Sequence, residues 1–562
     1  MKSHRVLSLS LSFLFVLPSV TSAQWLTNGN AVCTATGTQT SVVSAPDDAG
    51  GAIIAWADNR NGNNDIFAQR VTAMGQVLWT ADGVAVHVAV NSQSSPAIAP
   101  DGAGGAIIFW QHLGNNGTTD IYAQHVYPDG TLHWPGSGVL ICGAQQDQLT
   151  LRAVADGSGG AIVTWQDNRQ GSTMVADVYA QRIDVSGTPL WTTDGVAVCT
   201  AANQQRVPEL INDGSGGAII AWTDQRGVNT FVVYAQRIDS AGLTQWAADG
   251  VALSVDTKSS DACAITTDGA GGAIVVWSGY NGGVTFFDLF AQRINSSGAV
   301  QWTSGGVLAC VAASSQFDPC LVPDGSGGVI MAIADLRDED TNGYDLYAQR
   351  LNASGVKQWA TAGVPIAVTE GDNFEPLIVS DGSGGAVVCF TDARFGPFDV
   401  YAQRINGAGA VQWTTDGVQV CTAANGQFVS SAVSDGSGGA IMAWVDNRGG
   451  PQTDVYAHRI GSSGSTPTRV PTTPTGTILG QNHPNPFNPS TTIEYTLTAR
   501  TPVKIEIFDA KGARVASLDE GMREPGTHRA QWNASPTVSS GVYFYRLAGA
   551  PAAESRKMVL IK

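Results

Sequence analysis

The chain of 562 residues carries 30 basic against 47 acidic side chains, a formal net charge of −17 at pH 7. Such an excess of acid repels phosphate backbones and anionic lipid, which argues against nucleic acid and membrane surfaces as partners. Only 14% of the residues are charged and 66 are glycine, a composition typical of many short strands joined by tight turns, and the length predicts more than one domain.

The first 23 residues have the three parts of a secretory signal peptide. Lys2 and Arg5 form a basic start, an apolar run follows over 6–20, and Thr21-Ser22-Ala23 offers small residues for cleavage. The apolar run is too short to cross a bilayer comfortably, and no later stretch is long enough. We therefore expect residues 1–23 to be removed and the chain to be exported without membrane insertion. A single membrane anchor is the alternative.

A short element, Asp-Gly-Ser/Ala-Gly-Gly followed by an apolar run that mostly ends in Trp, recurs along the chain. Successive copies are 54 to 57 residues apart. Regular self-similarity of this length predicts a repeat architecture. The eight copies begin at Asp47 (where the second residue is Asp48 instead of Gly), Asp101, Asp156, Asp213, Asp268, Asp324, Asp381 and Asp435.

Each repeat carries signals for four short strands. In the fourth repeat, apolar runs lie at 218–222 and 233–238, and Asp239-Ser-Ala-Gly242 is typical of a hairpin turn. The runs do not alternate with polar residues, which indicates strands buried on both faces, as in a blade between two neighbours. The pattern predicts an all-β fold with an eight-bladed β-propeller of ~55-residue repeats over 24–460. A β-solenoid is the alternative.

The two ends of the repeat array favour a closed ring. A Trp-x-x-x-Gly-x-x-Val segment ends the first seven repeats. Another copy, at Trp25, precedes every glycine turn, and the last repeat stops at Ile460 without such a segment. The N-terminal segment can therefore supply the strand that the last blade lacks, which removes two open sheet edges. A solenoid has separate ends and would gain nothing from this arrangement.

Eight cysteines in an exported chain invite a disulfide framework. Equivalent side chains on successive blades fan too far apart to be bridged, so we expect mostly buried free thiols. The one pair to test is Cys310 with Cys320, and no Cys-x-x-Cys or His-rich spacing suggests zinc. Five cysteines occupy the same position of the repeat: Cys33, Cys142, Cys199, Cys310 and Cys421.

An Asp-x-Arg element follows the apolar run in six repeats. Catalysis needs one asymmetric constellation, whereas six copies of a pair are typical of a hydrogen bond that fixes each blade. We predict a structural role, with metal ligation or acid–base chemistry as the alternative. The pairs are Asp58/Arg60, Asp167/Arg169, Asp224/Arg226, Asp335/Arg337, Asp392/Arg394 and Asp446/Arg448.

Three repeats depart from this pattern and are better places to search for a site. The second has His112 where the Asp is expected, and the fifth has Tyr280 before a loop with two phenylalanines. The sixth has an acidic loop with Asp338, Glu339 and Asp340, whose oxygens are candidates to hold Ca²⁺, although a solvated loop is the plainer interpretation. No nucleophile–base set or phosphate-binding loop stands out, so no catalytic and no cofactor-binding residue is predicted.

The composition changes after Ile460. Residues 461–477 are rich in Ser, Thr and Pro, which is typical of a linker. Short alternating strands follow at 491–497, 503–508 and 542–547. The last ~85 residues, 478–562, therefore predict a small C-terminal Ig-like β-sandwich.

The C-terminal segment also carries several spaced motifs: Asn485, Pro486, Phe487, Asn488 and Pro489, then Gly541 and Tyr543, and finally Lys557 and Lys562. Together they resemble the type A C-terminal sorting domain of the type IX secretion system, and the Ig-like domain of flagellar hook-capping proteins. The resemblance implies passage through the periplasm, recognition by outer-membrane secretion machinery, and a secreted, extracellular or outer-surface protein. An ordinary adhesion sandwich is the alternative.

For the propeller itself, even repeats without a catalytic set predict a non-catalytic binding module for a glycan or a protein. The alternative is an extracellular polysaccharide-degrading enzyme, a glycoside hydrolase or lyase with its site at the propeller axis. Convergence of His112, Asp338, Glu339 and Tyr280 in one pocket would favour that enzyme. A scaffold that acts by self-association is a third hypothesis, and the fold alone does not choose among them.

Overall fold

The computed structural model describes residues 25–562 except 137, 172–174, 228–229, 256–259, 281–286, 340–341, 467, 470–477, 481, 483, 498–500, 524–525 and 549–554. Every regular element in these residues is a strand. The chain divides into two compact units, Met1–Thr468 and Arg469–Lys562, which are described separately. No helix in the described residues has the length and apolar character needed to cross a bilayer.

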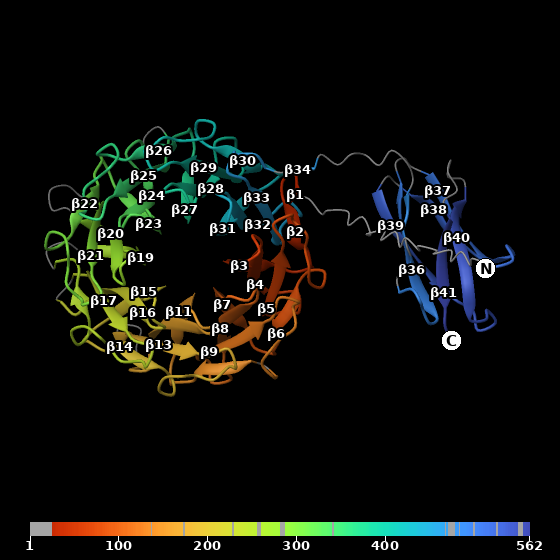
Figure 1. Ribbon diagram of the computed structural model, residues 1–562, viewed down its shortest axis with the longest axis horizontal. Coiled ribbons are helices and arrows are strands. Elements are labelled where there is room, and N and C mark those ends of the chain that lie inside the picture. The colour runs from red at the N-terminus through yellow and green to blue at the C-terminus, as the bar shows by residue number, and fades with distance from the viewer. Residues whose placement is uncertain are drawn as a thin grey trace, which may run out of the picture. The chain divides into compact units, whose positions relative to one another are not determined.

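The described part of the first unit contains eight four-stranded antiparallel sheets, which form the blades of a ring (Figure 1). The eight-bladed β-propeller that the repeats predict is thereby confirmed. Blades one to four comprise β3 (Gln39–Pro46), β4 (Ala52–Asp58), β5 (Asp65–Val71) and β6 (Val84–His87); β7 (Gln93–Pro100), β8 (Ala106–Leu113), β9 (Thr119–Val126) and β10 (Val139–Cys142); β11 (Gln148–Ala155), β12 (Ala161–Asp167), β13 (Asp177–Ile183) and β14 (Val196–Cys199); and β15 (Gln205–Asn212), β16 (Ala218–Asp224), β17 (Val232–Ile238) and β18 (Val251–Ala252).

The next three blades follow the same order, whereas the eighth takes its outer strand from the other end of the chain. Blades five to seven comprise β19 (Ser260–Thr267), β20 (Ala273–Tyr280), β21 (Phe287–Ile294) and β22 (Val307–Cys310); β23 (Gln316–Pro323), β24 (Val329–Asp335), β25 (Asp345–Leu351) and β26 (Val364–Ala367); and β27 (Asn373–Ser380), β28 (Ala386–Asp392), β29 (Asp399–Ile405) and β30 (Val418–Cys421). Blade eight comprises β31 (Gln427–Ser434), β32 (Ala440–Asp446), β33 (Asp454–Ile460) and β2 (Asn30–Cys33).

The first strand of each blade lies nearest the ring axis (Figure 1). Each of these inner strands contacts the inner strand of the next blade, and β3 of blade one also contacts β31 of blade eight. At the rim, β2 pairs antiparallel with β33, with Asn30 opposite Ala457 and Ala31 opposite Tyr456. The chain therefore closes its ring by backbone pairing between residues more than four hundred positions apart. Two short strands remain, β1 (Trp25–Leu26) before β2 and β34 (Thr468–Arg469) after β33.

The second strand of each blade forms the core between neighbouring blades. All seven residues of β16 are buried, and Trp222 from this strand packs in a cluster with Ile162 and Val178 of the preceding blade. Gly250 has φ +89°, and a Cβ at this position would overlap the ring of Trp222. The Trp and Gly of the repeat therefore match each other: the glycine takes a backbone conformation that other residues avoid and leaves room for the indole.

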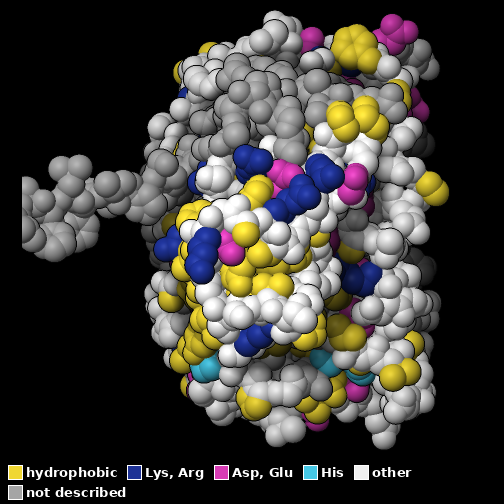
Figure 2. All heavy atoms as spheres, turned by 90° about the vertical axis from the view of Figure 1, so that its right-hand side faces the viewer, with side chains coloured by type: hydrophobic (Ala, Val, Ile, Leu, Met, Phe, Trp, Pro, Cys, Tyr) yellow, Lys and Arg dark blue, Asp and Glu magenta, His cyan; other side chains and the backbone are white. Residues whose placement is uncertain are grey.

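The second unit is a two-sheet β-sandwich. Side chains from both sheets share one buried cluster that includes Phe487, Ile493, Ile505, Trp532 and Tyr545. On the side of the molecule drawn in Figure 2, basic side chains lie among acidic and hydrophobic ones. The three-stranded sheet contains β35 (Ile478–Leu479), β36 (Ser490–Leu497) and β39 (Gly526–Asn533), and the four-stranded sheet contains β38 (Arg514–Arg523), β37 (Thr501–Asp509), β40 (Gly541–Ala548) and β41 (Ser555–Leu560).

Candidate functional site

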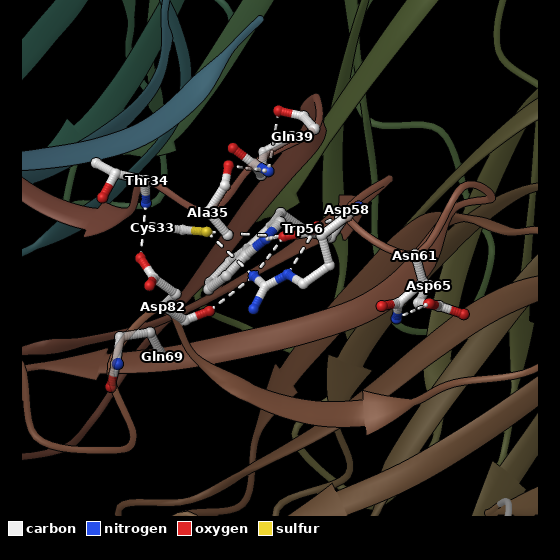
Figure 3. A network of polar contacts seen from close by, with 12 residues as sticks. Cys33, Thr34, Ala35, Gln39, Trp56, Asp58, Asn61, Asp65, Gln69 and Asp82 are labelled. Carbon is white, nitrogen blue, oxygen red and sulfur yellow. Dashed lines mark hydrogen bonds and ion pairs between the residues drawn. The ribbon is translucent and has the colours of Figure 1, made fainter. Parts of the chain in front are cut away.

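In each of the six Asp-x-Arg elements the Arg side chain forms an ion pair with the Asp two positions before it. Asp58 at the end of β4 accepts hydrogen bonds from Trp56 Nε1 at 2.8 Å and from Arg60 Nε at 2.9 Å (Figure 3). Arg60 also donates to the carbonyl of Asp82 at 2.8 Å, and its guanidinium lies 3.8 Å from the ring centre of Phe67. Burial raises the pKa of Asp58, but the hydrogen bonds from Arg60 and Trp56 bring it below the ordinary value. The carboxylate is fully engaged in holding its blade together.

A second Asp–Arg pair connects neighbouring blades. Arg182 Nη2 lies 2.8 Å from Asp156 Oδ2, the first residue of the glycine turn, and Arg182 Nη1 donates to the carbonyl of Ser240 in the next blade at 3.2 Å. The Trp191 indole donates to the same carbonyl at 3.1 Å. The polar residues that recur in the repeats thus join strands within blades and between neighbouring blades, and a ligand surface must be sought elsewhere.

The inner strands present such a surface at the ring axis. All eight carry a bulge near their first residues, and in six of them one bulge residue has a left-handed φ between 46° and 56°. This conformation is rare for residues other than glycine, above all for Thr and Val, and such residues often lie at functional sites. The six bulge residues are Ser41, Ser95, Thr150, Val207, Asp318 and Glu375.

Two cavities lie against these bulges. One, of about 540 Å³, is lined by Ser41, Glu375, Phe428 and neighbours from blades seven, eight and one. The other, of about 490 Å³, is lined by Ser41, Ser95 and Thr150 with neighbours from blades one to three. Hydroxyl and carboxylate groups therefore face open space at the axis.

One end of an aromatic arc reaches the first cavity, where Phe428 is a lining residue. Some of its rings belong to the second residue of an inner strand. The others belong to the first residue of the third strand of the preceding blade, or to the residue just before that strand. Phe398 packs against Phe374 with ring centres 5.2 Å apart and against Phe428 at 5.1 Å, and Phe287 packs against Phe317 at 5.9 Å. We define the aromatic arc as Phe231, Phe287, Phe317, Tyr344, Phe374, Phe398 and Phe428, which span blades four to eight.

Charged groups on the inner strands are few. The Arg152 side chain forms an ion pair with Glu209 of the next inner strand at 2.7 Å. Asp318 and Glu375 occupy equivalent bulges on adjacent blades, and both are exposed. Partial desolvation by the surrounding wall and the charge of Asp318 raise the pKa of Glu375. The end of the aromatic arc beside Asp318 and Glu375 is therefore acidic and partly apolar, whereas at its other end the Arg206 guanidinium lies 3.9 Å from the ring centre of Phe231.

Sequence reasoning missed this surface, although a signal was present. Phenylalanine stands at the second position of three consecutive inner strands, at Phe317, Phe374 and Phe428. Side chains there stay half-buried, while the neighbouring Gln316, Asn373 and Gln427 are buried. The alternation of a buried amide residue with a half-buried phenylalanine could be read in the sequence, but only the ring closure brings these strands to one axis.

The departures from the repeat do not converge. His112 lies in blade two, where its ring packs edge-on against Tyr122 with ring centres 5.2 Å apart. Its Nδ1 lies 3.2 Å from Gln93 Nε2. Desolvation lowers the pKa of His112. Because His112 replaces the carboxylate, the buried Trp110 Nε1 has no hydrogen-bond partner among the described residues. Blade two is held together by stacked rings in place of the Asp–Arg pair.

The remaining candidates lie across the ring from His112. Tyr280 ends β20 in blade five, and Asp338 and Glu339 lie exposed in the turn after β24 in blade six. Asp340 is outside the described residues. Over the described ranges, no group of three or more His, Cys, Asp or Glu side chains is arranged to hold a metal ion. The structure does not bring together the set that would have favoured an enzyme.

All eight cysteines are free thiols. The Cys310–Cys320 pairing is therefore wrong: Cys310 ends the outer strand of blade five, whereas Cys320 lies in the inner strand of blade six. The width of a blade separates the two positions. Burial raises the pKa of the Cys33 thiol to about 12, which keeps it protonated and unreactive.

The sorting-motif residues gather around the last strand of the sandwich. Asn485 Oδ1 accepts from the Val559 backbone at 2.8 Å, and its amide donates to the Lys557 carbonyl at 3.3 Å. Phe487 is buried, with its ring 5.4 Å from that of Trp532, and its backbone N–H donates to the Val559 carbonyl at 3.0 Å. The motif thus adds a short bridge to the edge of β41.

The other motif residues complete this end of the sandwich. Pro486 and Asn488 are exposed, the Pro489 carbonyl accepts from the Ala534 backbone, and Gly541 begins β40. The Tyr543 hydroxyl donates to the Ser539 carbonyl at 2.6 Å, and Lys562 Nζ donates to the Pro536 carbonyl at 2.7 Å. The first and last motifs of the segment therefore meet in one structural unit.

These features define a β-propeller protein with a separate C-terminal β-sandwich. Residues 482–562 match the model of the secretion system C-terminal sorting domain. The resemblance to a sorting domain is therefore confirmed, and the protein is secreted or held at the cell surface.

Solved structures with a similar fold include a polysaccharide lyase of family PL25, an ulvan lyase bound to -[GlcA(1-4)Rha3S]- (TM-score 0.41, 12% identity, covering 63% of this chain and 90% of that chain). They also include a thermostable family-43 glycoside hydrolase (TM-score 0.29, 12% identity, 50% and 96%) and Chaetomium thermophilum Sqt1 (TM-score 0.40, 11% identity, 76% and 97%). At these identities the likeness concerns the fold alone. No curated protein matches the chain in sequence.

Proposed function

We propose that this protein is a secreted, non-catalytic module that binds a neutral extracellular glycan at the ring axis. The observation that carries this proposal is the contact of Phe374, Phe398 and Phe428 beside a cavity of about 540 Å³ that Glu375 also lines. Ligand sites typically combine an apolar wall with a few polar groups that fix orientation.

The chemistry of this surface suits a sugar chain. The C–H face of a pyranose ring is apolar and packs on an aromatic face, while its hydroxyls need nearby acceptors and donors. The aromatic arc supplies the faces, and the Ser41 hydroxyl and the Glu375 carboxylate supply hydrogen bonds in the same cavity. An arc across five blades would contact several sugars in succession.

The charge of the protein narrows the ligand class. The net charge of −17, with Asp318 and Glu375 exposed at the axis, repels sulfated and uronic-acid polymers. Neutral polysaccharides escape that penalty. This is why we propose a neutral glycan over an anionic one or an acidic protein.

The test is binding of the purified protein to immobilised neutral and anionic polysaccharides, followed by titration of the best soluble oligosaccharide. We expect Phe428→Ala and Phe374→Ala each to weaken binding at least ~10-fold, about 1.4 kcal/mol. Leu140→Ala removes an exposed apolar side chain from the outer strand β10 and should leave binding unchanged. Binding that survives both Phe variants would contradict the proposal, as would a preference for anionic polymers.

A second candidate is hydrolysis of the bound glycan at the same surface. Asp318 and Glu375 offer two carboxylates on adjacent blades, and the raised pKa of Glu375 suits a general acid. Release of reducing ends by the wild-type protein, lost in Glu375→Gln while binding is kept, would favour this enzyme over the binding module.

We also infer how the protein reaches its destination. Residues 1–23 direct export and are removed, residues 461–477 act as a linker, and the sandwich is recognised by the outer-membrane secretion machinery. The sorting-domain match at residues 482–562 supports the last step.

A further inference from the structure

Blade two differs from the other blades at two positions that face each other across one hairpin. His125 in β9 stands where blade three has Arg182, and His133 stands where blade three has Leu190. The backbone N–H of His133 donates to the His125 carbonyl at 2.8 Å, next to the bridge between Val126 and Leu132. The two histidines are therefore cross-strand neighbours, a spacing at which side chains interact directly.

Their ring nitrogens meet. His125 Nδ1 lies 3.1 Å from His133 Nδ1, and His125 Nε2 lies 2.8 Å from Asp101 Oδ2. His125 and Asp101 are buried, while His133 is half-exposed. The other Asp101 oxygen accepts backbone hydrogen bonds from Ala103 and Gly105, which fixes the carboxylate.

The contact with Asp101 determines the tautomer of His125. A carboxylate accepts hydrogen bonds, so Nε2 of a neutral His125 carries the proton and Nδ1 keeps its lone pair. That lone pair is directed toward His133, whose own Nδ1 is the only other ring nitrogen within hydrogen-bond reach of it in the described residues. The ring of Tyr127 stacks on His133 with centres 4.6 Å apart, which restrains the second imidazole.

We propose that His125 Nδ1 and His133 Nδ1 bind one divalent late transition-metal ion, with water in the remaining positions. Two nitrogens that each lie about 2.0–2.1 Å from an ion are separated by about 3 Å when adjacent, close to the distance found here. Metal-binding histidines typically donate their other N–H to a carboxylate, which is the contact that Asp101 makes. Two imidazoles without a third protein ligand favour Cu²⁺, then Ni²⁺ and Zn²⁺.

The ion would replace contacts that this blade lacks. In blade three, Arg182 joins the glycine turn to the next blade, whereas the hydrogen bonds that the His125 ring makes in the described residues go to Asp101 and His133, both in blade two. Blade two keeps the bond from Trp134 Nε1 to the Val185 carbonyl at 3.0 Å. A metal that cross-links His125 to His133 would fasten the hairpin that carries Trp134. Because only the folded hairpin presents both nitrogens, the ion should stabilise the protein.

The experiment is calorimetric titration of the metal-free protein with Cu²⁺, Ni²⁺ and Zn²⁺ at pH 7.4, with electron paramagnetic resonance of the Cu²⁺ complex. We expect one site per chain with imidazole nitrogen coupling, and a rise in Tm with Ni²⁺. His133→Ala should weaken binding at least ~10-fold and cancel the rise in Tm.

Two further variants control for folding and for other histidines. The double variant His125→Arg/His133→Leu copies the pair found in blade three, Arg182 and Leu190, so it should fold and bind no ion. His112→Gln changes the other histidine of the blade and should keep full affinity. Wild-type protein without saturable binding below ~1 mM would overturn the proposal, as would unchanged affinity in His133→Ala or in the double variant.

Discussion

Trp25 stacks on His458 with ring centres 5.5 Å apart and planes 13° from parallel. The two rings come from opposite ends of the propeller sequence, and the Trp25 indole also donates to the Ala73 carbonyl of blade one at 3.1 Å. A single N-terminal side chain thus touches blade eight and blade one. Together with the pairing of β2 and β33, this contact holds the last junction of the ring.

The first prediction concerns His458, which stands where the other seven repeats have Gln. Burial lowers the pKa of His458 from 6.5 to about 4, so between these values the unfolded state binds a proton that the folded state does not. The free energy of unfolding is therefore highest above pH 6.5, and it falls by up to about 3 kcal/mol as the pH falls toward 4. His458→Gln should remove this dependence. Urea unfolding of both proteins at pH 7 and pH 5 measures it, and equal pH slopes would contradict the prediction.

The second prediction concerns Asp177, the first residue of β13. Burial and the charge of Asp167 raise the pKa of Asp177 from 3.8 to about 6, and its Oδ2 has no hydrogen-bond partner in the described residues. The folded state therefore binds the proton more tightly, and stability falls as the pH rises from 4 to 6. Asp177→Asn should raise the free energy of unfolding at pH 7 by about 1–3 kcal/mol and change little at pH 4.

Asp65 is the matched control for Asp177, at the same position in blade one. It accepts hydrogen bonds from Asn61 Nδ2 at 2.7 Å and from the Ala89 backbone at 3.1 Å. Asp65→Asn should therefore destabilise the protein at pH 7, and a gain of stability in both variants would refute the assignment.

The third prediction tests the Asp–Arg pairs. Arg226 Nη2 lies 2.6 Å from Asp224 Oδ2, and Trp222 Nε1 donates to the same oxygen at 2.9 Å. Arg226→Ala leaves a buried carboxylate without its cation and should cost about 3 kcal/mol. Adding Asp224→Asn removes the stranded charge and should recover part of the loss. Chemical unfolding of the two variants decides, and a double variant less stable than the single one would show that the charge is not the cause.

The fourth prediction concerns the sorting domain. Phe487→Ala empties a buried site against Trp532 and should cost about 3–4 kcal/mol in the sandwich. We expect less extracellular protein because the misfolded tail is not recognised. Asn488→Ala changes an exposed neighbour and should leave stability unchanged. Immunoblots of medium and cell fractions provide the measurement. Normal export of the Phe487 variant would contradict the prediction, because recognition would then not depend on the folding of the sandwich.

The repeat, the number of strands and the sorting tail are all readable from local sequence patterns. Glycine turns every 54 to 57 residues and the spare Trp25 segment reflect local rules, because a turn needs left-handed backbone and an open blade needs a partner strand. The Asp-x-Arg pairs were also readable, since the two partners lie only two positions apart in the sequence.

The side-chain contacts near the axis and inside blade two depend instead on how the strands and blades pack. Phe374 and Phe428 are 54 positions apart in sequence, and both reach Phe398 only because inner strands of adjacent blades lie side by side. The sequence spacing of His125 and His133 does not indicate a contact, yet the hairpin register places their Nδ1 atoms 3.1 Å apart. Side-chain convergence of this kind depends on strand register and blade packing, which no local pattern specifies.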